Sequence, residues 1–457
     1  MKKRYDLRAV ASAAFAATLL MAVPALNSCG KRHSCNGECK EQLGIKGKEK
    51  TSERDARFRA ENPETADRFK VYVECSYSMD AYVNGRTDFK TKLHTIISDV
   101  TANVLEDGKE VSYNYIVSDT IVRQQVKRPV AFTRNMSPAS FTQTFPGDDT
   151  PRKHSDIIEI IRTVADSTKG NGISMFVSDC VYSPDGNDDI DKALEIQQTE
   201  MRNILKNKCK GDKSFGVLLY RLESDFQGEY YLKNDQSITI NGKRPYFVWF
   251  FGKESILAKV QQSLKDRIGT DQSVAGLPGY KYVPYMTYGN DHEYHYLNKK
   301  AKKKIKDKDK KDKDNLYFSF DLYADLSRLP LTEKYITDTA NYNCSGSQEV
   351  FIEKIVPCTK SKDSASAYNY KYTVCVRGNR NGVVSPCMVK ISLKNMLSDS
   401  AKYEWITRYD DPKGDDLIGG YDEAKKKLRT FGIKSLADGI TDIYKEKDYA
   451  TFKIKIN

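Results

Sequence analysis

Short apolar segments alternate with segments of helical periodicity between residues 68 and 265, and this alternation constrains the fold more than any other feature. The apolar, β-branched segments are residues 69–75, 111–117, 172–178, 214–222 and 245–251. The segments that place apolar residues at helical spacing are residues 88–104, 156–167, 189–206 and 254–264. Because strands separated by helices favour right-handed βαβ units, we predict an α/β domain over residues 68–265 with a doubly wound, mostly parallel sheet. Residues 229–240, between the last two strands, are expected to form a hairpin extension.

The pattern changes beyond this α/β segment. Residues 266–314 contain a tyrosine-rich segment (278–296) and a run of ten Lys and four Asp (299–314). In residues 315–457 apolar and polar residues alternate with period two, as in LYFSFDLYADL and TFKIKI, which is typical of antiparallel strands. We expect a β-rich, sandwich-like C-terminal domain there. A helix over residues 434–447 would pack on this domain or return to the first one.

The N-terminus has the three parts of an export signal over residues 1–28: a basic start, an apolar stretch and a small-residue end. A membrane-spanning helix is the alternative, but Pro24 interrupts the apolar stretch. The tetrapeptide LNSC, which ends at Cys29, resembles the lipobox of bacterial lipoproteins and implies lipidation of that cysteine. Residues 29–67 are polar and are expected to form a flexible tether. The resemblance implies attachment to a membrane through a lipid anchor, in the bacterial outer membrane or at the cell surface.

The formal net charge of +12 does not indicate a nucleic-acid-binding surface. The excess of basic residues lies in residues 1–28, 29–50 and 299–314, and the rest of the chain is neutral. We therefore expect no nucleic-acid partner. The Lys/Asp run is predicted to be a solvated, disordered insertion, and contact with anionic lipid or polysaccharide is the alternative.

Polar side chains follow the first predicted strand at the point where it ends. Glu74, Ser76 and Ser78 lie in this loop, in VYVECSYSMD. Open α/β sheets bind their ligands at the carboxyl ends of the strands. These three side chains are therefore candidate binding residues.

The order of these elements, together with the words VYVECSYSM and GISMFVSD, is similar to the von Willebrand factor A-like family. The resemblance implies a metal-ion-dependent adhesion site, in which oxygen ligands bind Mg²⁺ or Mn²⁺ and a carboxylate of a protein partner completes the shell. Carried over residue by residue, Ser76 and Ser78 match the two serines of the family motif. Asp179 matches the later Asp of that motif.

At two further ligand positions the match to the family is less direct. Glu74 replaces the first Asp, and its side chain is longer by about 1.5 Å. The family motif also takes a hydroxyl from a middle loop, which lies between the first ligand loop and the later Asp. Ser155, or less favourably Thr150, is the candidate for this hydroxyl. In the alternative interpretation the serine hydroxyls of the first loop bond the backbone of their own loop, Asp179 caps the segment that follows it, and Ser155 or Asp156 is the N-cap of the next helix. The chain would then be a metal-free structural scaffold.

Two of the ten cysteines, Cys75 and Cys180, directly follow Glu74 and Asp179. In the von Willebrand factor A-like family the first and fourth strands are neighbours, about 4.8 Å apart, which is within disulfide range. The resemblance thus allows a Cys75–Cys180 disulfide that would join the two ligand-bearing loops. Two small buried thiols are the alternative.

The sequence contains no Gly-x-Ser-x-Gly elbow, no His-Glu-x-x-His and no phosphate-binding glycine loop, so we expect a binding protein and not an enzyme. His292 and His295 lie three apart, but a tyrosine-rich surface loop explains them better. The tyrosines between Tyr280 and Tyr296 suit binding of a glycan or a protein, or the half-buried face of a β extension. The predicted function is adhesion or complex assembly through a protein partner, with a glycan-binding lipoprotein as the alternative.

Overall fold

The computed structural model describes residues 65–147, 152–153, 155–182, 189–231, 237–268, 281–286, 296–306, 316–324, 326, 329, 331–357, 369–379, 382–383, 387–400, 404–410, 428–446 and 448–456. The predicted signal segment, Cys29 and the tether up to residue 64 lie outside these residues, as do Thr150, His292 and His295. Within the described ranges, no helix has both the length and the apolar character needed to span a membrane.

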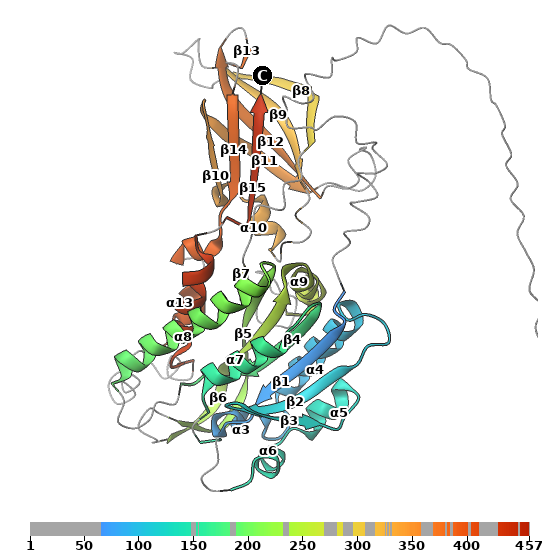
Figure 1. Cartoon of the computed structure of the whole chain (residues 1–457), viewed down its shortest axis with the longest axis vertical. Coiled ribbons are helices and arrows are strands. Elements are labelled where there is room, and N and C mark those ends of the chain that lie inside the picture. Colours follow the sequence, from blue (N-terminus) through green and yellow to red (C-terminus); the bar gives the residue numbers. More distant parts are fainter. Residues whose placement is uncertain are drawn as a thin grey trace, which may run out of the picture.

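A mixed sheet of seven strands, in the order β3-β2-β1-β4-β6-β5-β7, forms the centre of the first domain (Figure 1). Its strands are β1 (Arg68–Glu74), β2 (Val111–Val117), β3 (Thr120–Gln124), β4 (Gly172–Ser178), β5 (Phe215–Tyr231), β6 (Ser237–Lys253) and β7 (Lys281–Met286). β1 pairs in parallel with β2 and β4, as the sequence predicts for βαβ units. The other neighbours in the sheet pair antiparallel.

The β5–β6 hairpin is the main difference from a doubly wound parallel sheet. The hairpin predicted at residues 229–240 is confirmed, but its pairing continues along both strands from Phe215–Lys253 to Tyr231–Ser237. Tyr231 of β5 pairs with Ser237 of β6, so the pair closes as a hairpin and is antiparallel. β6 therefore enters the sheet antiparallel to β4.

Helices cover both faces of this sheet. One face carries α3 (Asp80–Val83), α4 (Asp88–Asn103), α5 (Pro129–Asn135), α6 (Pro138–Thr144) and α9 (Glu254–Ile268). The other face carries α7 (Ile157–Ser167), α8 (Ile190–Gly211) and α13 (Ile433–Tyr444). Side chains of a strand alternate between faces, so Val71 and Val73 join the first core while Tyr72 joins the second. The sheet is thus covered on both faces, as predicted.

Helix α13 returns from the C-terminal region to the first domain, which confirms one of the two destinations predicted for it. Figure 1 shows α13 beside α8, and the two helices are in contact. A Cβ atom at Gly439 would lie 2.5 Å from the backbone oxygen of Gln198, so only glycine permits this close approach. The side-chain amide of Gln198 also donates a 2.9 Å hydrogen bond to the carboxylate of Asp442.

The C-terminal region forms two antiparallel sheets, as predicted. One sheet contains β10 (Tyr342–Gly346), β14 (Cys387–Leu393) and β15 (Ala450–Ile456). The other contains β8 (Tyr296–Lys306), β9 (Leu316–Ala324), β11 (Val350–Pro357) and β12 (Tyr370–Asn379), with β13 (Gly382–Val383) paired to β12. The short helices α10 (Glu333–Thr337) and α11 (Glu404–Thr407) lie outside both sheets. Tyr372 of the larger sheet packs edge-on against Tyr342 and Phe452 of the smaller one, so the two sheets face each other as in a sandwich.

Two predictions about the region between the domains need correction. The first half of the Lys/Asp run is part of strand β8, which pairs with β9, and is not a disordered insertion. The boundary at residue 265 is also too early, because β7 extends the central sheet beside β5. Residues 281–286 of the tyrosine-rich segment therefore form a β extension of this sheet.

Candidate functional site at the edge of strands β1 and β4

The carboxyl ends of β1 and β4 meet where the strand order of the sheet reverses. From β1 the chain builds β2 and β3 on one side and then crosses to place β4 on the other side. The last registered pair of these two strands is Val73 with Val177, so Glu74 and Ser178 come next to each other. The hydroxyl of Ser178 donates a hydrogen bond to the Glu74 carboxylate. A switch point of this kind, at the carboxyl ends of the strands, is where open α/β sheets bind ligands.

The loop after β1 places both predicted serines beside Asp179. Ser76 has an extended backbone and precedes the 3₁₀ turn η1 (Tyr77–Met79), without capping it through its side chain. The hydroxyls of Ser76 and Ser78 are 3.0 Å apart and hydrogen-bonded. Ser78 also donates a 3.1 Å hydrogen bond to Oδ1 of Asp179. The two hydroxyls thus bond each other and the distant carboxylate, which differs from the alternative in which they bond their own loop backbone.

Asp179 is buried with one of its oxygens unused. Its Oδ1 accepts from Ser78 and, at 3.4 Å, from the backbone amide of Val181. Its Oδ2 is buried and has no hydrogen-bond partner in the described part of the chain. Burial raises the pKa of this carboxyl group, against the opposing effect of the Arg244 guanidinium. An unpaired carboxylate oxygen in a buried site is a position that a cation would satisfy.

Ser155 supplies a third buried hydroxyl from the middle loop. The adjacent Asp156 is the N-cap of α7 and accepts from the amides of Ile158 and Glu159 at 2.9 and 3.1 Å, as the capping interpretation predicts. The Ser155 hydroxyl lies near enough to Glu74 to lower the pKa of that carboxyl group. It nevertheless makes no hydrogen bond of ordinary geometry to any described residue.

Glu74 is the first of the predicted ligand residues and is buried at the end of β1. Burial and the negative charge of Asp179 raise the pKa of Glu74 to about 7, while the hydroxyls of Ser178, Ser155 and Ser76 act in the opposite direction. The five predicted ligand residues have exposed fractions between 1% and 8%: Glu74, Ser76, Ser78, Ser155 and Asp179. Two neighbouring carboxylates in such a site repel each other, so the site favours a proton or a cation.

Two buried arginines beside the site were not predicted from the sequence. Arg152 is 1% exposed, and its guanidinium binds the carbonyl of Cys75 and the carboxylate of Asp80. Arg244 is fully buried and donates a 2.8 Å hydrogen bond to the backbone oxygen of Arg429. No sequence signal identifies these residues, because arginine is usually exposed and a pattern of polar residues does not reveal a buried one.

The Cys75–Cys180 disulfide allowed by the family resemblance is not present. Both thiols are free and buried. Because Val73 pairs with Val177, Cys75 is level with Asp179, and Cys180 is one residue further along. Side chains alternate between the faces of a sheet, so the two cysteines pack in the cores on opposite faces. The alternative of two buried thiols is the correct one.

The assembled donor set consists of two carboxylates and three hydroxyls, all of them oxygen ligands. Among the described residues, no group of three or more His, Cys, Asp and Glu side chains has the arrangement of a metal site. A hard cation such as Mg²⁺ does not need such a group, since it accepts few carboxylates together with hydroxyls and waters. Oδ2 of Asp179 and Oγ of Ser155 have no hydrogen-bond partner among the described residues, so both oxygens could coordinate a cation. The residues therefore fit a small divalent cation.

Comparison with known proteins adds no assignment. No protein-family model matches the chain. No curated protein and no solved structure matches it either. The chemistry of the site is therefore interpreted from its own residues and their geometry.

Proposed function

We propose that this chain is a lipid-anchored protein of the bacterial envelope that binds another protein, for adhesion or complex assembly, through a divalent cation at the β1–β4 edge. The observation that carries the proposal is the hydrogen bond between Ser78 and Asp179, with Oδ2 of Asp179 left unpaired in the buried site. Residues 101 positions apart thereby bring an unused carboxylate oxygen and a pair of hydroxyls together. Such convergence at a switch point supports a binding site.

The cation would be held by Glu74, Ser76, Ser78, Ser155 and Asp179. A bound Mg²⁺ or Mn²⁺ would supply open coordination positions for water and for an Asp or Glu of the partner. Asp179 and Glu74 would provide the negative charge, and the hydroxyls would set the geometry. Because all five side chains are nearly buried, a partner carboxylate reaches this site only if chain segments around it move outward. Partner binding is therefore expected to alter the conformation around the site.

The von Willebrand factor A-like family remains the proposed relative of the first domain. Its strand order β3-β2-β1-β4 and the site at the β1–β4 edge support this proposal. The antiparallel β6 beside β4 departs from a doubly wound arrangement. The likeness therefore applies to the half of the sheet that carries the site. The lipid anchor at Cys29 and the location in the outer membrane or at the cell surface are proposed from the LNSC tetrapeptide.

A metal-free structural scaffold is the second candidate, and the two buried arginines favour it. Burial raises the pKa of Asp179, and the Arg244 guanidinium opposes this rise, so the protein already places one positive charge near this carboxylate. Arg152 pairs with Asp80 at the same loop. In a scaffold of this kind the partner would bind an outer surface, and the Ser78–Asp179 hydrogen bond would only fix the loops. Partner binding would then be insensitive to chelators.

Capture of a partner under controlled cation conditions separates the two candidates. The full chain in detergent would be immobilised and exposed to envelope extract in Mg²⁺ or in EDTA. The cation proposal predicts a partner that is retained in Mg²⁺, released by EDTA and not retained by the Asp179→Asn variant. Asp119→Asn removes an exposed carboxylate from the β2–β3 turn and serves as the matched control that retains the partner. Equal retention in EDTA and by Asp179→Asn would support the scaffold instead.

A further inference from the structure

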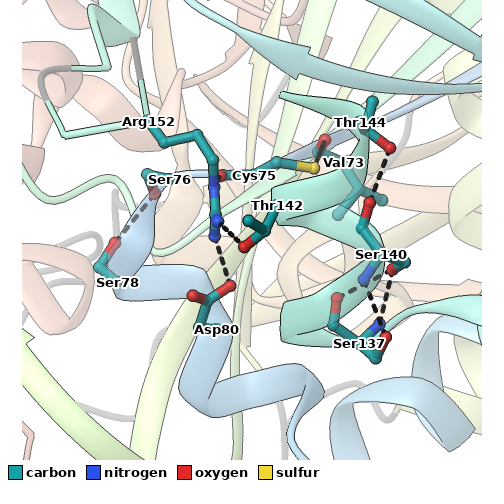
Figure 2. Close-up of polar contacts among 10 residues, drawn as sticks. All are labelled: Val73, Cys75, Ser76, Ser78, Asp80, Ser137, Ser140, Thr142, Thr144 and Arg152. Carbon is teal, nitrogen blue, oxygen red and sulfur yellow. Dashed lines mark hydrogen bonds and ion pairs between the residues drawn. The ribbon is translucent and has the colours of Figure 1, made fainter. Parts of the chain in front are cut away.

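The guanidinium group of Arg152 joins three separate segments around the Ser76–Ser78 loop (Figure 2). Its Nε donates a 2.6 Å hydrogen bond to the carbonyl oxygen of Cys75. One terminal nitrogen donates to the hydroxyl of Thr142 on α6 at 2.7 Å. The other forms a 2.5 Å ion pair with Asp80 at the start of α3. A single side chain thus connects the loop that contains Arg152 with α6 and with both ends of the Ser76–Ser78 loop.

The positions of these contacts bracket the two candidate ligands. Cys75 directly precedes Ser76, and Asp80 follows Ser78 by two residues. The backbone carbonyl of Arg152 also accepts a 3.2 Å hydrogen bond from the amide of Tyr77, between the two serines. The guanidinium carbon lies 4.6 Å from the centre of the Tyr77 ring, in the range of a cation–π contact. Arg152 therefore contacts the Ser76–Ser78 loop on both sides of the two serines and also between them.

We propose that Arg152 is the positioning residue of the Ser76–Ser78 loop and sets the hydroxyl geometry on which cation affinity depends. The inference rests on the proposed cation site and names a residue outside the predicted ligand set. Only arginine has donors in a rigid planar fork that reach three acceptors at once. Lysine keeps the charge but carries a single ammonium group on a flexible stem. Residues that orient metal ligands typically change metal affinity by about 10- to 100-fold when replaced.

The sign of the electrostatic effect makes this role testable. A positive charge near a cation site repels the cation, although Asp80 offsets part of the charge of Arg152. Removing the guanidinium would therefore strengthen cation binding if charge were its main contribution. A positioning role has the opposite consequence, because a loosened loop no longer presents both hydroxyls together. Weaker binding after removal of a positive charge is thus a signature of positioning.

Titration of the full chain in detergent with Mn²⁺ tests the proposal. We expect Arg152→Met to weaken Mn²⁺ binding by about 10- to 100-fold, and Arg152→Lys to restore little of the loss. Thr142 is exposed on α6, so Thr142→Val removes one of the three contacts with little risk to folding and should weaken binding by a smaller factor. Arg162→Met removes a guanidinium from the surface of α7 and is the matched control, with unchanged affinity. Affinity equal to or above wild type in folded Arg152→Met would overturn the proposal.

Amide hydrogen exchange in EDTA gives a readout that does not depend on the cation. We expect exchange at Tyr77 and Met79, whose amides donate to Arg152 and Ser76, to accelerate in Arg152→Met and in Thr142→Val but not in Arg162→Met. If the wild-type chain binds no Mn²⁺, the proposed cation site fails, and the exchange data alone decide whether Arg152 positions the loop. Unchanged exchange at Tyr77 in Arg152→Met would contradict the positioning role.

Discussion

The hydroxyl of Ser78 donates a 3.1 Å hydrogen bond to Oδ1 of Asp179, and the two residues are 101 positions apart in the chain. The bond is possible because β1 and β4 run in parallel as neighbours and end at the same edge of the sheet. It joins the loop after β1 to the loop after β4. A perturbation of either loop is therefore expected to reach the other.

Replacing Ser78 with Ala removes the only side-chain donor that Asp179 has among the described residues. We expect this change to lower the free energy of unfolding by about 1 to 3 kcal/mol in EDTA, because a buried acceptor loses its partner. Urea unfolding measures the change. Ser263→Ala on α9, where the hydroxyl bonds only its own helix among the described residues, is the control and should stay within about 0.5 kcal/mol of wild type. A Ser78→Ala chain as stable as this control would contradict the account.

The raised pKa of Glu74 makes folding stability depend on pH, and a neutral substitution at this position should remove that dependence. The pKa of Glu74 in the folded chain is raised from its ordinary value of 4.5 to about 7, first by burial and then by Asp179. Below the ordinary value both folded and unfolded chains hold the proton. Between the two values only the folded chain keeps it, so stability falls as the pH rises, and above about 7 the loss is complete.

The Glu74→Gln variant should therefore be more stable than wild type at pH values above the raised pKa in EDTA, by about 2 to 3 kcal/mol, and equally stable below about pH 4. Urea unfolding across this pH range is the measurement. Glu195→Gln, at an exposed position on α8, should follow the wild-type pH profile. The assignment fails if Glu74→Gln and wild type show parallel pH profiles.

Gly439 sets the contact between α13 and α8, and with it the attachment of the C-terminal region to the first domain. Gly439→Ala would place a Cβ atom 2.5 Å from the backbone oxygen of Gln198, so the helices must separate. We expect a loss of about 1 to 3 kcal/mol in thermal or urea unfolding, despite the better helix propensity of alanine. Gly211→Ala, where no atom lies within 4 Å, provides the control and should be neutral or slightly stabilising. Equal stability of the two variants would show that α13 does not depend on this contact.

Cys75 and Cys180 are expected to be reduced in the purified protein, even under oxidising conditions. Burial raises the pKa of both thiols, so alkylating reagents should not label them in the folded chain. Unfolding without reductant should expose both to labelling, and peptide mass spectrometry would locate the labels. A disulfide-linked Cys75–Cys180 peptide under these conditions would require a different arrangement of the two strand ends.

The location of the site followed from the sequence more directly than its environment. The apolar strands before Glu74 and Asp179 have a strong pattern, and parallel strands place such ends at one edge. The direction of β6 was not evident, because a hairpin and a βαβ unit have the same apolar strand signal. Leu436 and Ile440 indicate that α13 has a buried face, but not which partner covers it. Alternation along the strands, if applied to Cys75 and Cys180, would already have argued against a disulfide.

The burial of arginine beside the site could not be predicted from the pattern of apolar and polar residues. Arg152 lies in a polar loop, and its guanidinium is buried only because Cys75, Thr142 and Asp80 converge on it from three elements. Such a network depends on tertiary contacts between segments distant in the chain. A residue-by-residue comparison with a family motif also omits it, since the motif names ligands and not the groups that orient them.

Direct titration of the full chain with Mg²⁺ and Mn²⁺ by isothermal calorimetry tests the central claim most directly. The account predicts saturable binding of one ion per wild-type chain, binding weakened by about 100-fold or more in Asp179→Asn, and wild-type affinity in the Asp119→Asn control. Absence of binding by the wild-type chain, or equal affinity in the wild type and Asp179→Asn, would contradict it.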